Sequence, residues 1–410
     1  MQRYDTYKDS GVKWLGEIPS HWEVIKTSHL FTHIGSGTTP KSGSEEYYTE
    51  DGIPFLQTGD LNDGFVVDTS KKITEKALRD TNLTIYLQGS LVIAMYGATI
   101  GKLGILGIDT TVNQACCVLP KSPKVETRFA FYAYLAAKND LIFQSKGGGQ
   151  PNISQDTIKN ERIPVPSRAE QTAIANYLDT ATAKIDTAIA QQQKMIDLLN
   201  ERKQIIINRA VTKGLNPNVI MKDSGVEWIG EVPEGWEVRK LKHIAKLQSG
   251  ETISSDSFTE TGYPVFGGNG FRGYTNRFTN DGDYVLIGRQ GALCGNVNYA
   301  HGQFFASEHA VVVYPHKHEN IVWLGEVIRT SNLNQYSQSA AQPGLAVSLI
   351  QNICYPYPPK EEREEIALYI AKNIKVIDEG IKNYQEQISL LQERKQIIIN
   401  EVVTGKVKVV

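Results

Sequence analysis

Cysteine is scarce in this chain of 410 residues, and its few occurrences are not spaced as ligand pairs. Cys116 and Cys117 are adjacent, whereas Cys294 and Cys354 stand alone, so no CxxC element predicts a zinc site or a disulfide framework. This pattern favours a reducing compartment, and the N-terminal residues lack the apolar run of a secretion signal. We therefore expect a cytoplasmic protein.

Long apolar runs and an excess of charge of one sign are also missing. The most apolar stretch, residues 91–108, is interrupted by several glycines and by Lys102, which excludes it as a membrane span. The formal net charge of −2 excludes a uniformly polybasic nucleic-acid binder but allows local basic patches. We expect no association with a membrane.

Sequence motifs of common enzymes are absent as well. There is no GxxxxGK(S/T) phosphate loop, no HExxH, no GxSxG, and no GxGxxG between a strand and a helix. His316 and His318 lack further ligands nearby in sequence, so a solvated loop is favoured over a metal site. Residues 35–40, GSGTTP, predict a turn after a strand, with contact to a DNA backbone as the alternative. We expect no catalytic residue, metal or cofactor in this chain.

The chain contains each of its main segments twice. Residues 9–26 and 223–240 are identical at most positions, and LLNERKQIIIN at 198–208 differs from residues 390–400 only at Asn200. Such self-similarity indicates a duplicated architecture. The segments enclosed by the repeats, at 27–146 and 241–338, differ in length and sequence, so each half is a similar frame around its own insert.

Both inserts are rich in Gly, Thr, Asn, Tyr and Val and show short alternating apolar runs. The two inserts share one short motif: residues 97–101 resemble residues 291–295, and each motif follows a strand-like segment. These features predict two mainly β or mixed domains with long loops.

After each insert, a Pro-rich bend precedes about forty residues without proline. Ser167 and Glu170 match a capping box, and Gly214 and Gly405 follow the last periodic residues, where helices end. The apolar residues step by four and three, which predicts a heptad seam with one polar layer, Lys203 and Lys395. The predicted seam residues are Ile185, Ile189, Ile196, Leu199 and Ile206 in the first helix and Ile377, Ile381, Tyr384, Ile388, Leu391 and Ile398 in the second.

The two helices are expected to pair in antiparallel orientation, because the second insert begins soon after the first helix ends and leads directly into the second. A coiled coil that joins two copies of the chain is the alternative. The expected fold is therefore α+β, with two mainly β or mixed domains separated by two long antiparallel coiled-coil helices in a pseudo-twofold internal repeat. The expected segments are 1–166 and 214–359, each a repeated segment plus an insert domain, and the helices 167–213 and 360–404.

This organisation resembles the specificity subunit of type I restriction–modification systems. The residues that carry the resemblance are DSGVxWxGExPxxWEV at 9–24 and 223–238, the QPN and QPG segments that lead to Pro-x-Pro, and the two ERKQIIIN segments. The resemblance implies a host-defence protein in which each insert is a target recognition domain for one half of a bipartite, gapped site in double-stranded DNA.

The resemblance further implies that the helices set the spacer and dock two methyltransferase subunits, through which the restriction subunits join. N6-adenine methylation and ATP-dependent restriction would take place on these partners, which would bring S-adenosylmethionine, Mg²⁺ and ATP. The target adenines would be flipped out of the duplex there. A coiled-coil scaffold without DNA and an autonomous nuclease or methyltransferase are the alternatives.

Candidate DNA contacts follow from side-chain chemistry, since lysine pairs with phosphate, glutamine and asparagine with adenine, and arginine with guanine. The candidates in the first insert are Lys41, Gln57, Thr58, Lys71, Lys72, Lys102, Asn113 and Gln114. Those in the second insert are Asn269, Arg272, Tyr274, Asn276, Arg277, Arg289, Gln290 and Asn296. Ordinary surface or turn positions are the alternative for each of them.

Two further groups of residues are interpreted as structural. The run Gly147 to Gly149 predicts a hinge or a closely approached turn, with DNA contact as the alternative. The tryptophans Trp14, Trp22, Trp228 and Trp236 lie in the repeated frame, so core or docking positions are expected for them. Acidic and basic residues nearly balance in each insert, which predicts weak DNA binding by the chain without its partners.

Overall fold

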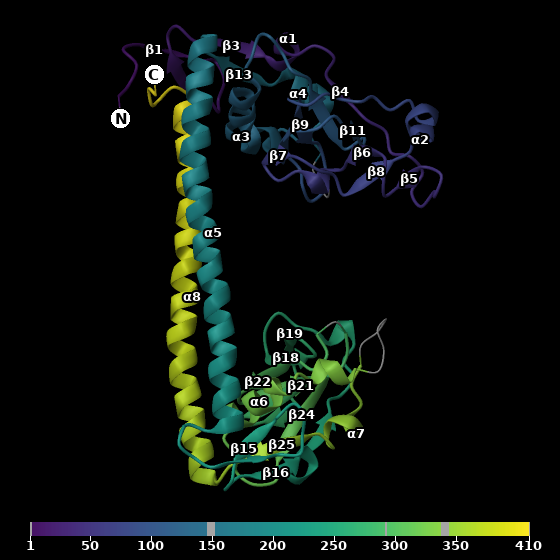
Figure 1. Cartoon of the computed structure of the whole chain (residues 1–410), viewed down its shortest axis with the longest axis vertical. Helices are drawn as coiled ribbons and strands as arrows, with labels where there is room; N and C mark the ends of the chain where they lie inside the picture. Colours follow the sequence, from purple (N-terminus) through teal and green to yellow (C-terminus); the bar gives the residue numbers. More distant parts are fainter. Residues whose placement is uncertain (1, 146–151, 292, 338–343, 410) are drawn as a thin grey trace. The chain divides into compact units, whose positions relative to one another are not determined.

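The computed structural model describes residues 2–145, 152–291, 293–337 and 344–409 (Figure 1). They belong to two compact units: unit 1 is formed by Met1–Gln191 with Gln387–Val410, and unit 2 by Gln192–Glu386. Each unit contains one insert and parts of the two long helices, α5 (Arg168–Lys213) and α8 (Lys360–Val403). The predicted α+β class is confirmed.

Unit 1 holds two mixed sheets, with strand orders β4–β12–β9–β10–β7 and β11–β6–β8–β5, and two strand pairs, β1–β2 and β3–β13. Its strands are β1 (Tyr7–Asp9), β2 (Glu17–Pro19), β3 (Glu23–Lys26), β4 (Gly35–Ser36), β5 (Tyr48–Thr49), β6 (Ile53–Leu56), β7 (Gly64–Val66), β8 (Lys71–Ile73), β9 (Leu91–Ala94), β10 (Leu103–Leu106), β11 (Thr111–Val112), β12 (Cys116–Leu119) and β13 (Arg162–Val165). Its shorter helices are α1 (Thr27–Leu30), the 3-10 turn η1 (Thr58–Asp60), α2 (Glu75–Asp80), α3 (Thr127–Phe143) and α4 (Gln155–Asn160).

Unit 2 repeats this plan with two four-stranded sheets, β17–β24–β21–β22 and β19–β18–β23–β20, and the pairs β14–β15 and β16–β25. Its strands are β14 (Met221–Asp223), β15 (Glu231–Pro233), β16 (Glu237–Lys240), β17 (Ala245–Ser249), β18 (Tyr263–Gly267), β19 (Gly270–Thr275), β20 (Asn280–Asp281), β21 (Tyr284–Gly288), β22 (Val297–Ala300), β23 (Gln303–Ala306), β24 (Ala310–Pro315) and β25 (Cys354–Tyr357). Its shorter helices are η2 (Leu241–His243), η3 (Ser255–Ser257), α6 (Ile321–Thr330), η4 (Leu333–Tyr336) and α7 (Val347–Ile350).

The long helices begin and end at the residues that the sequence marks. At the start of α5, Ser167 N donates to Glu170 Oε2 (3.2 Å) and Glu170 N donates to Ser167 Oγ (3.3 Å), the reciprocal pattern of a capping box. Gly214 and Gly405, at φ values of 74° and 72°, follow the two helix ends. An added Cβ at Gly405 would lie 2.3 Å from Cδ of Pro19, so this position requires glycine.

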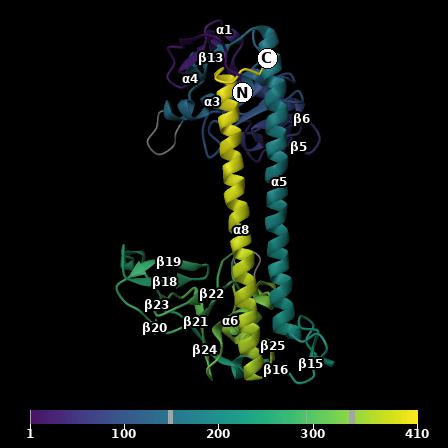
Figure 2. The ribbon, with the colours of Figure 1, turned by 90° about the vertical axis from the view of Figure 1, so that its left-hand side faces the viewer.

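The two helices are antiparallel within each unit. In unit 1 the first part of α5 packs beside the last part of α8, and in unit 2 the last part of α5 packs beside the first part of α8 (Figures 1 and 2). The core of unit 1 accordingly joins Ile174 and Leu178 of α5 to Ile399 and Val402 of α8. No described helix combines the length and apolarity that crossing a lipid bilayer requires.

The predicted seam residues are buried or half-buried, but Ile207 and Ile399 are more deeply buried than the predicted seam residues Ile206 and Ile398 beside them. Ile185, Ile196 and Ile377 are buried, and the other predicted seam positions are half-buried. Each of the two seam lysines pairs with an aspartate of the other long helix. Lys203 Nζ lies 2.8 Å from Asp378 Oδ1 in unit 2, and Lys395 Nζ lies 2.7 Å from Asp186 Oδ1 in unit 1.

Candidate nucleic-acid interface

In unit 1, two neighbouring parallel strands end at the same place. Strands β6 and β11 pair in register, with Phe55 opposite Thr111, and beyond them Asn113 N donates to the carbonyl of Leu56 (3.0 Å). The residues that follow the two strands are candidate contacts from the sequence. We call this set edge 1, and it consists of Gln57, Thr58, Asn113 and Gln114.

Short hydrogen-bonded loops hold edge 1 in place. The backbone N–H of Gln57 donates to Asp60 Oδ2 (2.8 Å), and Asn113 Oδ1 accepts from the N–H of Ala115 (3.1 Å). Gln114 accepts a hydrogen bond from the hydroxyl of Thr39. Gln57, Thr58 and Asn113 are half-buried and Gln114 is exposed, so edge 1 presents amide and hydroxyl groups on a fixed backbone.

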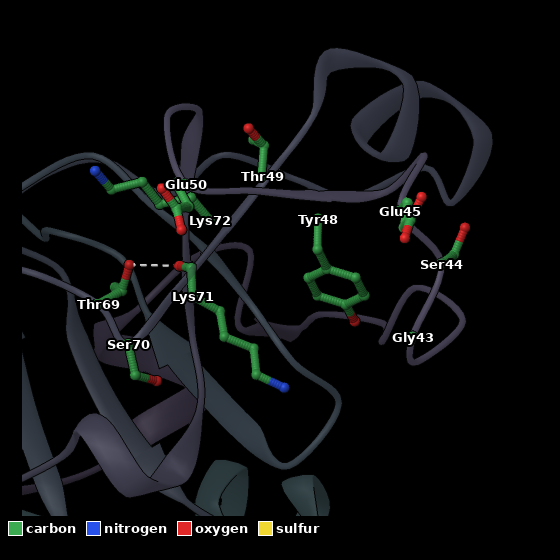
Figure 3. Close-up of a pocket in the computed structure, with 10 residues that line it drawn as sticks. All are labelled: Gly43, Ser44, Glu45, Tyr48, Thr49, Glu50, Thr69, Ser70, Lys71 and Lys72. Atoms are coloured by element: carbon green, nitrogen blue, oxygen red, sulfur yellow. Dashed lines mark hydrogen bonds between the residues drawn. The ribbon is translucent and has the colours of Figure 1, made fainter.

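A pocket of about 640 Å³ lies beside edge 1 and is lined by Lys71 and Lys72 of β8 (Figure 3). The side chain of Lys71 extends into the same space as the ring of Tyr48, with Nζ 5.5 Å from the ring centroid. Burial raises the pKa of Tyr48, so its hydroxyl is a neutral donor, directed to Pro40 O (2.9 Å).

The pocket is tied to edge 1 and carries charge of both signs. Ser70 N donates to Asp60 Oδ1 (3.1 Å), and the other oxygen of the same carboxylate accepts from Gln57. Glu45 and Glu50 also line the pocket, so its two lysines are not its only charged groups.

The other two lysines among the candidate contacts of the first insert, Lys41 and Lys102, do not line this pocket. Lys41 is exposed between β4 and β5, and Lys102 lies at the base of the β9–β10 turn, where its N–H donates to Thr99 O (2.9 Å). In the GSGTTP segment, Gly35 and Ser36 form β4 and residues 37–40 are an irregular connection, so the predicted turn is wrong at these positions. A Cβ at Gly37 would lie 1.5 Å from Val112 O, so glycine is needed for this segment to cross the end of β11.

Unit 2 has an equivalent edge. Strands β18 and β23 are parallel, with Phe266 opposite Ala306, and Ser307 N donates to Phe266 O (2.8 Å) as Asn113 donates to Leu56. A Cβ at Gly250 would lie 2.2 Å from Ala306 O, which repeats the close approach at Gly37. The same backbone arrangement is thus built twice and carries different side chains.

A pocket of about 580 Å³ lies at the ends of these strands in unit 2, and we call the residues that line it edge 2. It brings together three candidate contacts, Asn269, Arg272 and Gln290, and Asn296 joins them by donating Nδ2 to Asn269 Oδ1 (3.4 Å). The residues of edge 2 are Gly268, Asn269, Phe271, Arg272, Gln290, Gly291, His309 and Gly344.

Sequence reasoning missed two side chains of edge 2. His309 Nδ1 lies 2.7 Å from Gln290 Oε1, and Phe271 is 55% exposed although it is a large apolar residue. Phe271 lies between the candidate contacts Asn269 and Arg272 in the sequence. This position is the one signal in the sequence that could have predicted a role for Phe271. The position of His309 depends on strand pairing and carries no such signal.

The other candidates of the second insert do not line the pocket. Tyr274 packs against Phe271 with ring centroids 5.1 Å apart. Arg277 pairs with Glu251 (2.8 Å), and Arg289 Nη1 donates to Ser249 Oγ (3.2 Å). Asn276 is exposed just after β19.

The frame residues have structural contacts. Trp22 and Trp236 are buried, and their indole N–H groups donate to Glu170 (3.3 Å) and Glu362 (2.8 Å) at the starts of the long helices. The run Gly147 to Gly149 lies outside the described residues. His316 Nε2 lies 2.9 Å from the carbonyl of Lys242, and the described ranges contain no group of three or more His, Cys, Asp or Glu side chains placed to hold a metal.

Comparison with known proteins gives consistent results over nearly the whole chain. Residues 19–196 and 233–392 match the family described as type I restriction modification DNA specificity domain. The chain is 31% identical over 368 residues to the Escherichia coli type I restriction enzyme EcoprrI specificity subunit, covering 85% of this chain and 87% of that protein. It is 26% identical to the MjaVIII specificity subunit of Methanocaldococcus jannaschii, with 98% and 97% covered.

A solved structure shares the fold. It is described as the structural basis underlying complex assembly and conformational transition of the type I R-M system. The TM-score is 0.69 at 16% sequence identity, and the match covers 95% of this chain and 99% of the other.

Proposed function

Since the chain belongs to the type I restriction–modification family of DNA specificity subunits, we propose that edges 1 and 2 each read one half of a bipartite, gapped DNA site. The observation that carries this proposal is the duplicated edge: the same parallel-strand ends and the same glycine approach present different polar side chains in the two units. A constant backbone with variable side chains suits two unlike half-sites, because base edges are read by side-chain hydrogen bonds.

Docking of two methyltransferase subunits is assigned to the long helices. Leu198 and Ile205 are 46% and 59% exposed in unit 2, and their repeat equivalents Leu390 and Ile397 are 64% and 47% exposed in unit 1. Each pair is one heptad apart, next to the seam residues, and forms a second apolar stripe on the helix. Two identical stripes suit two copies of one partner.

The partners complete the function in this proposal. The methyltransferase subunits bring S-adenosylmethionine and the restriction subunits bring ATP and Mg²⁺, whereas this chain recognises DNA and has no active site. Because acidic and basic residues nearly balance in each insert, much of the phosphate neutralisation must come from the partners. The long helices would hold the two half-sites at a fixed spacing.

A map of N6-methyladenine in host DNA, with and without this gene, tests the recognition role. We expect one bipartite, gapped motif to lose its methylation when the gene is deleted and to regain it on complementation. An unchanged map in cells that contain the assembled methyltransferase complex would contradict the proposal.

The docking role is tested by Leu198→Lys and Leu390→Lys, alone and combined, in native mass spectrometry with the methyltransferase. Each single variant should lose one bound methyltransferase and the double variant both. The matched control is Ile220→Lys, an apolar residue of unit 2 that is 73% exposed outside the helices. Equal binding by the double variant and this control would refute the assignment.

A further inference from the structure

The two edges differ in the chemistry that they present. The four members of edge 1 carry only neutral amide and hydroxyl groups. Edge 2 offers the amides of Asn269 and Gln290 but adds a guanidinium group, that of Arg272. The guanidinium group of Arg272 is therefore a feature of edge 2 that the four residues of edge 1 lack.

The structure holds Arg272 in the pocket while leaving its side chain accessible. It is an exposed residue of β19. Its aliphatic stem crosses Gly267, where a Cβ would lie 2.4 Å from Arg272 Cδ, and its guanidinium carbon lies 5.8 Å from the ring centroid of Phe258. Stem packing and a cation–π contact limit the conformations of a long side chain without using its N–H donors.

The other two candidate arginines are engaged elsewhere. Arg277 is paired with Glu251 at 2.8 Å, and its guanidinium carbon lies 4.6 Å from the ring centroid of Phe305. Arg289 donates to Ser249. Of the three, Arg272 is the arginine that lines the pocket of edge 2.

A guanidinium group presents a planar fork of donors that matches the O6 and N7 acceptors of guanine, whereas amide side chains match adenine. We propose that Arg272 reads a guanine in the half-site bound by unit 2. This inference rests on the proposed function and adds the base type and the residue that selects it. The half-site bound by unit 1 is then read by amide and hydroxyl groups.

The experiment compares N6-methyladenine maps made by the complete methyltransferase complex in a host that lacks this modification. The complex contains the unaltered chain, Arg272→Ala, Arg272→Lys or the control Lys317→Ala. Lys317 is exposed in unit 2 beyond Pro315, the last residue of β24, whereas His309 of the pocket directly precedes that strand. The control removes a positive charge from the same unit away from the pocket.

For the unaltered chain we expect a guanine position in one half-site, with discrimination on the order of 5- to 150-fold against other bases. Arg272→Ala should reduce discrimination at that position to within about twofold and leave the other half-site and the spacer unchanged. Arg272→Lys should relax the same position, because it keeps the charge and loses the fork. Lys317→Ala should give the motif of the unaltered chain, and the methylation that remains in each variant shows that it folds.

Four results would overturn the inference. A uniform loss of methylation in Arg272→Ala without relaxation of the motif would identify a phosphate contact. A motif without guanine in the affected half-site, or an unchanged motif in Arg272→Ala, would exclude guanine reading while leaving the proposed function intact. Absence of any bipartite motif for the unaltered chain would overturn the proposed function itself, and this inference with it.

Discussion

A buried ion pair in unit 2 joins Arg363, in the first turn of α8, to Glu319, immediately before the N-cap of α6, and its removal has a predictable cost. Arg363 Nε lies 2.8 Å from Glu319 Oε2, and the two side chains are 7% and 1% exposed. The hydroxyl of Tyr357 donates to Glu319 Oε1 (2.7 Å). Removing one member of such a pair leaves an uncompensated buried charge, which costs about 3–5 kcal/mol. We expect Arg363→Gln and Glu319→Val each to lower the free energy of unfolding of unit 2 by about this amount.

Unit 1 contains a neutral version of the same contact. Gln171 Nε2 donates to Pro166 O (2.9 Å), as Arg363 Nη1 donates to Pro358 O (2.6 Å). The residue that corresponds to Glu319, immediately before the N-cap of the next helix, is the buried Val125. The double variant Arg363→Gln/Glu319→Val reproduces in unit 2 the neutral pair of residues, glutamine and valine, that unit 1 has at these positions. It should lose less than about 1.5 kcal/mol, because replacing both members of a buried pair is often nearly neutral.

Urea unfolding followed by tryptophan fluorescence measures these effects, since Trp323 is fully buried and its ring lies 5.3 Å from the Arg363 guanidinium carbon. The control is Arg277→Gln, which breaks a pair with 57% and 59% exposed side chains and should cost less than about 1 kcal/mol. If the double variant loses the sum of the two single losses, the pair is not energetically coupled and the reasoning is refuted.

Two further predictions concern the helices and the thiols. Lys203→Glu should lower the melting temperature by the equivalent of about 1 kcal/mol, because it places a second carboxylate beside that of Asp378. The second substitution Asp378→Lys should restore the melting temperature. Melting curves without this rescue would disprove the pairing. Burial raises the pKa of Cys116, and that of Cys117 to about 12, so both thiols stay protonated at pH 8. A thiol reagent at pH 8, followed by mass spectrometry, should label the half-buried Cys354 first and the adjacent pair only on unfolding; early labelling of the pair would contradict its burial.

The sequence was sufficient to predict the α+β class, the duplication and the antiparallel helices. These features depend on repeated segments and on short sequence patterns that can be recognised without knowing which strands pair. Heptad spacing, the capping residues Ser167 and Glu170, and the glycines after the helices act within a few residues. The resemblance to specificity subunits rested on the repeated segments, and the family match confirms it.

The surroundings of the candidate contacts were less predictable, because they depend on which strands pair. Gln57 and Asn113 are far apart in sequence and meet only because β6 and β11 are parallel neighbours. In unit 2, His309 reaches Gln290 because β21 and β24 are antiparallel neighbours. The partner of Lys203 was also missed, because Asp378 lies beside the apolar seam where periodicity gives no signal. The individual DNA contacts remain predictions.

Unit 1 is assembled from the two ends of the chain, whereas unit 2 is one continuous stretch. The core of unit 1 needs Ile399, Val402 and Val403, which emerge from the ribosome after every residue of unit 2. Unit 2 can therefore complete its core during synthesis. The core of unit 1 is completed only when the last turns of α8 have been synthesised, and until then its apolar residues stay exposed. Contacts so distant in sequence form slowly. The recognition domain made first is thus the one that finishes folding last.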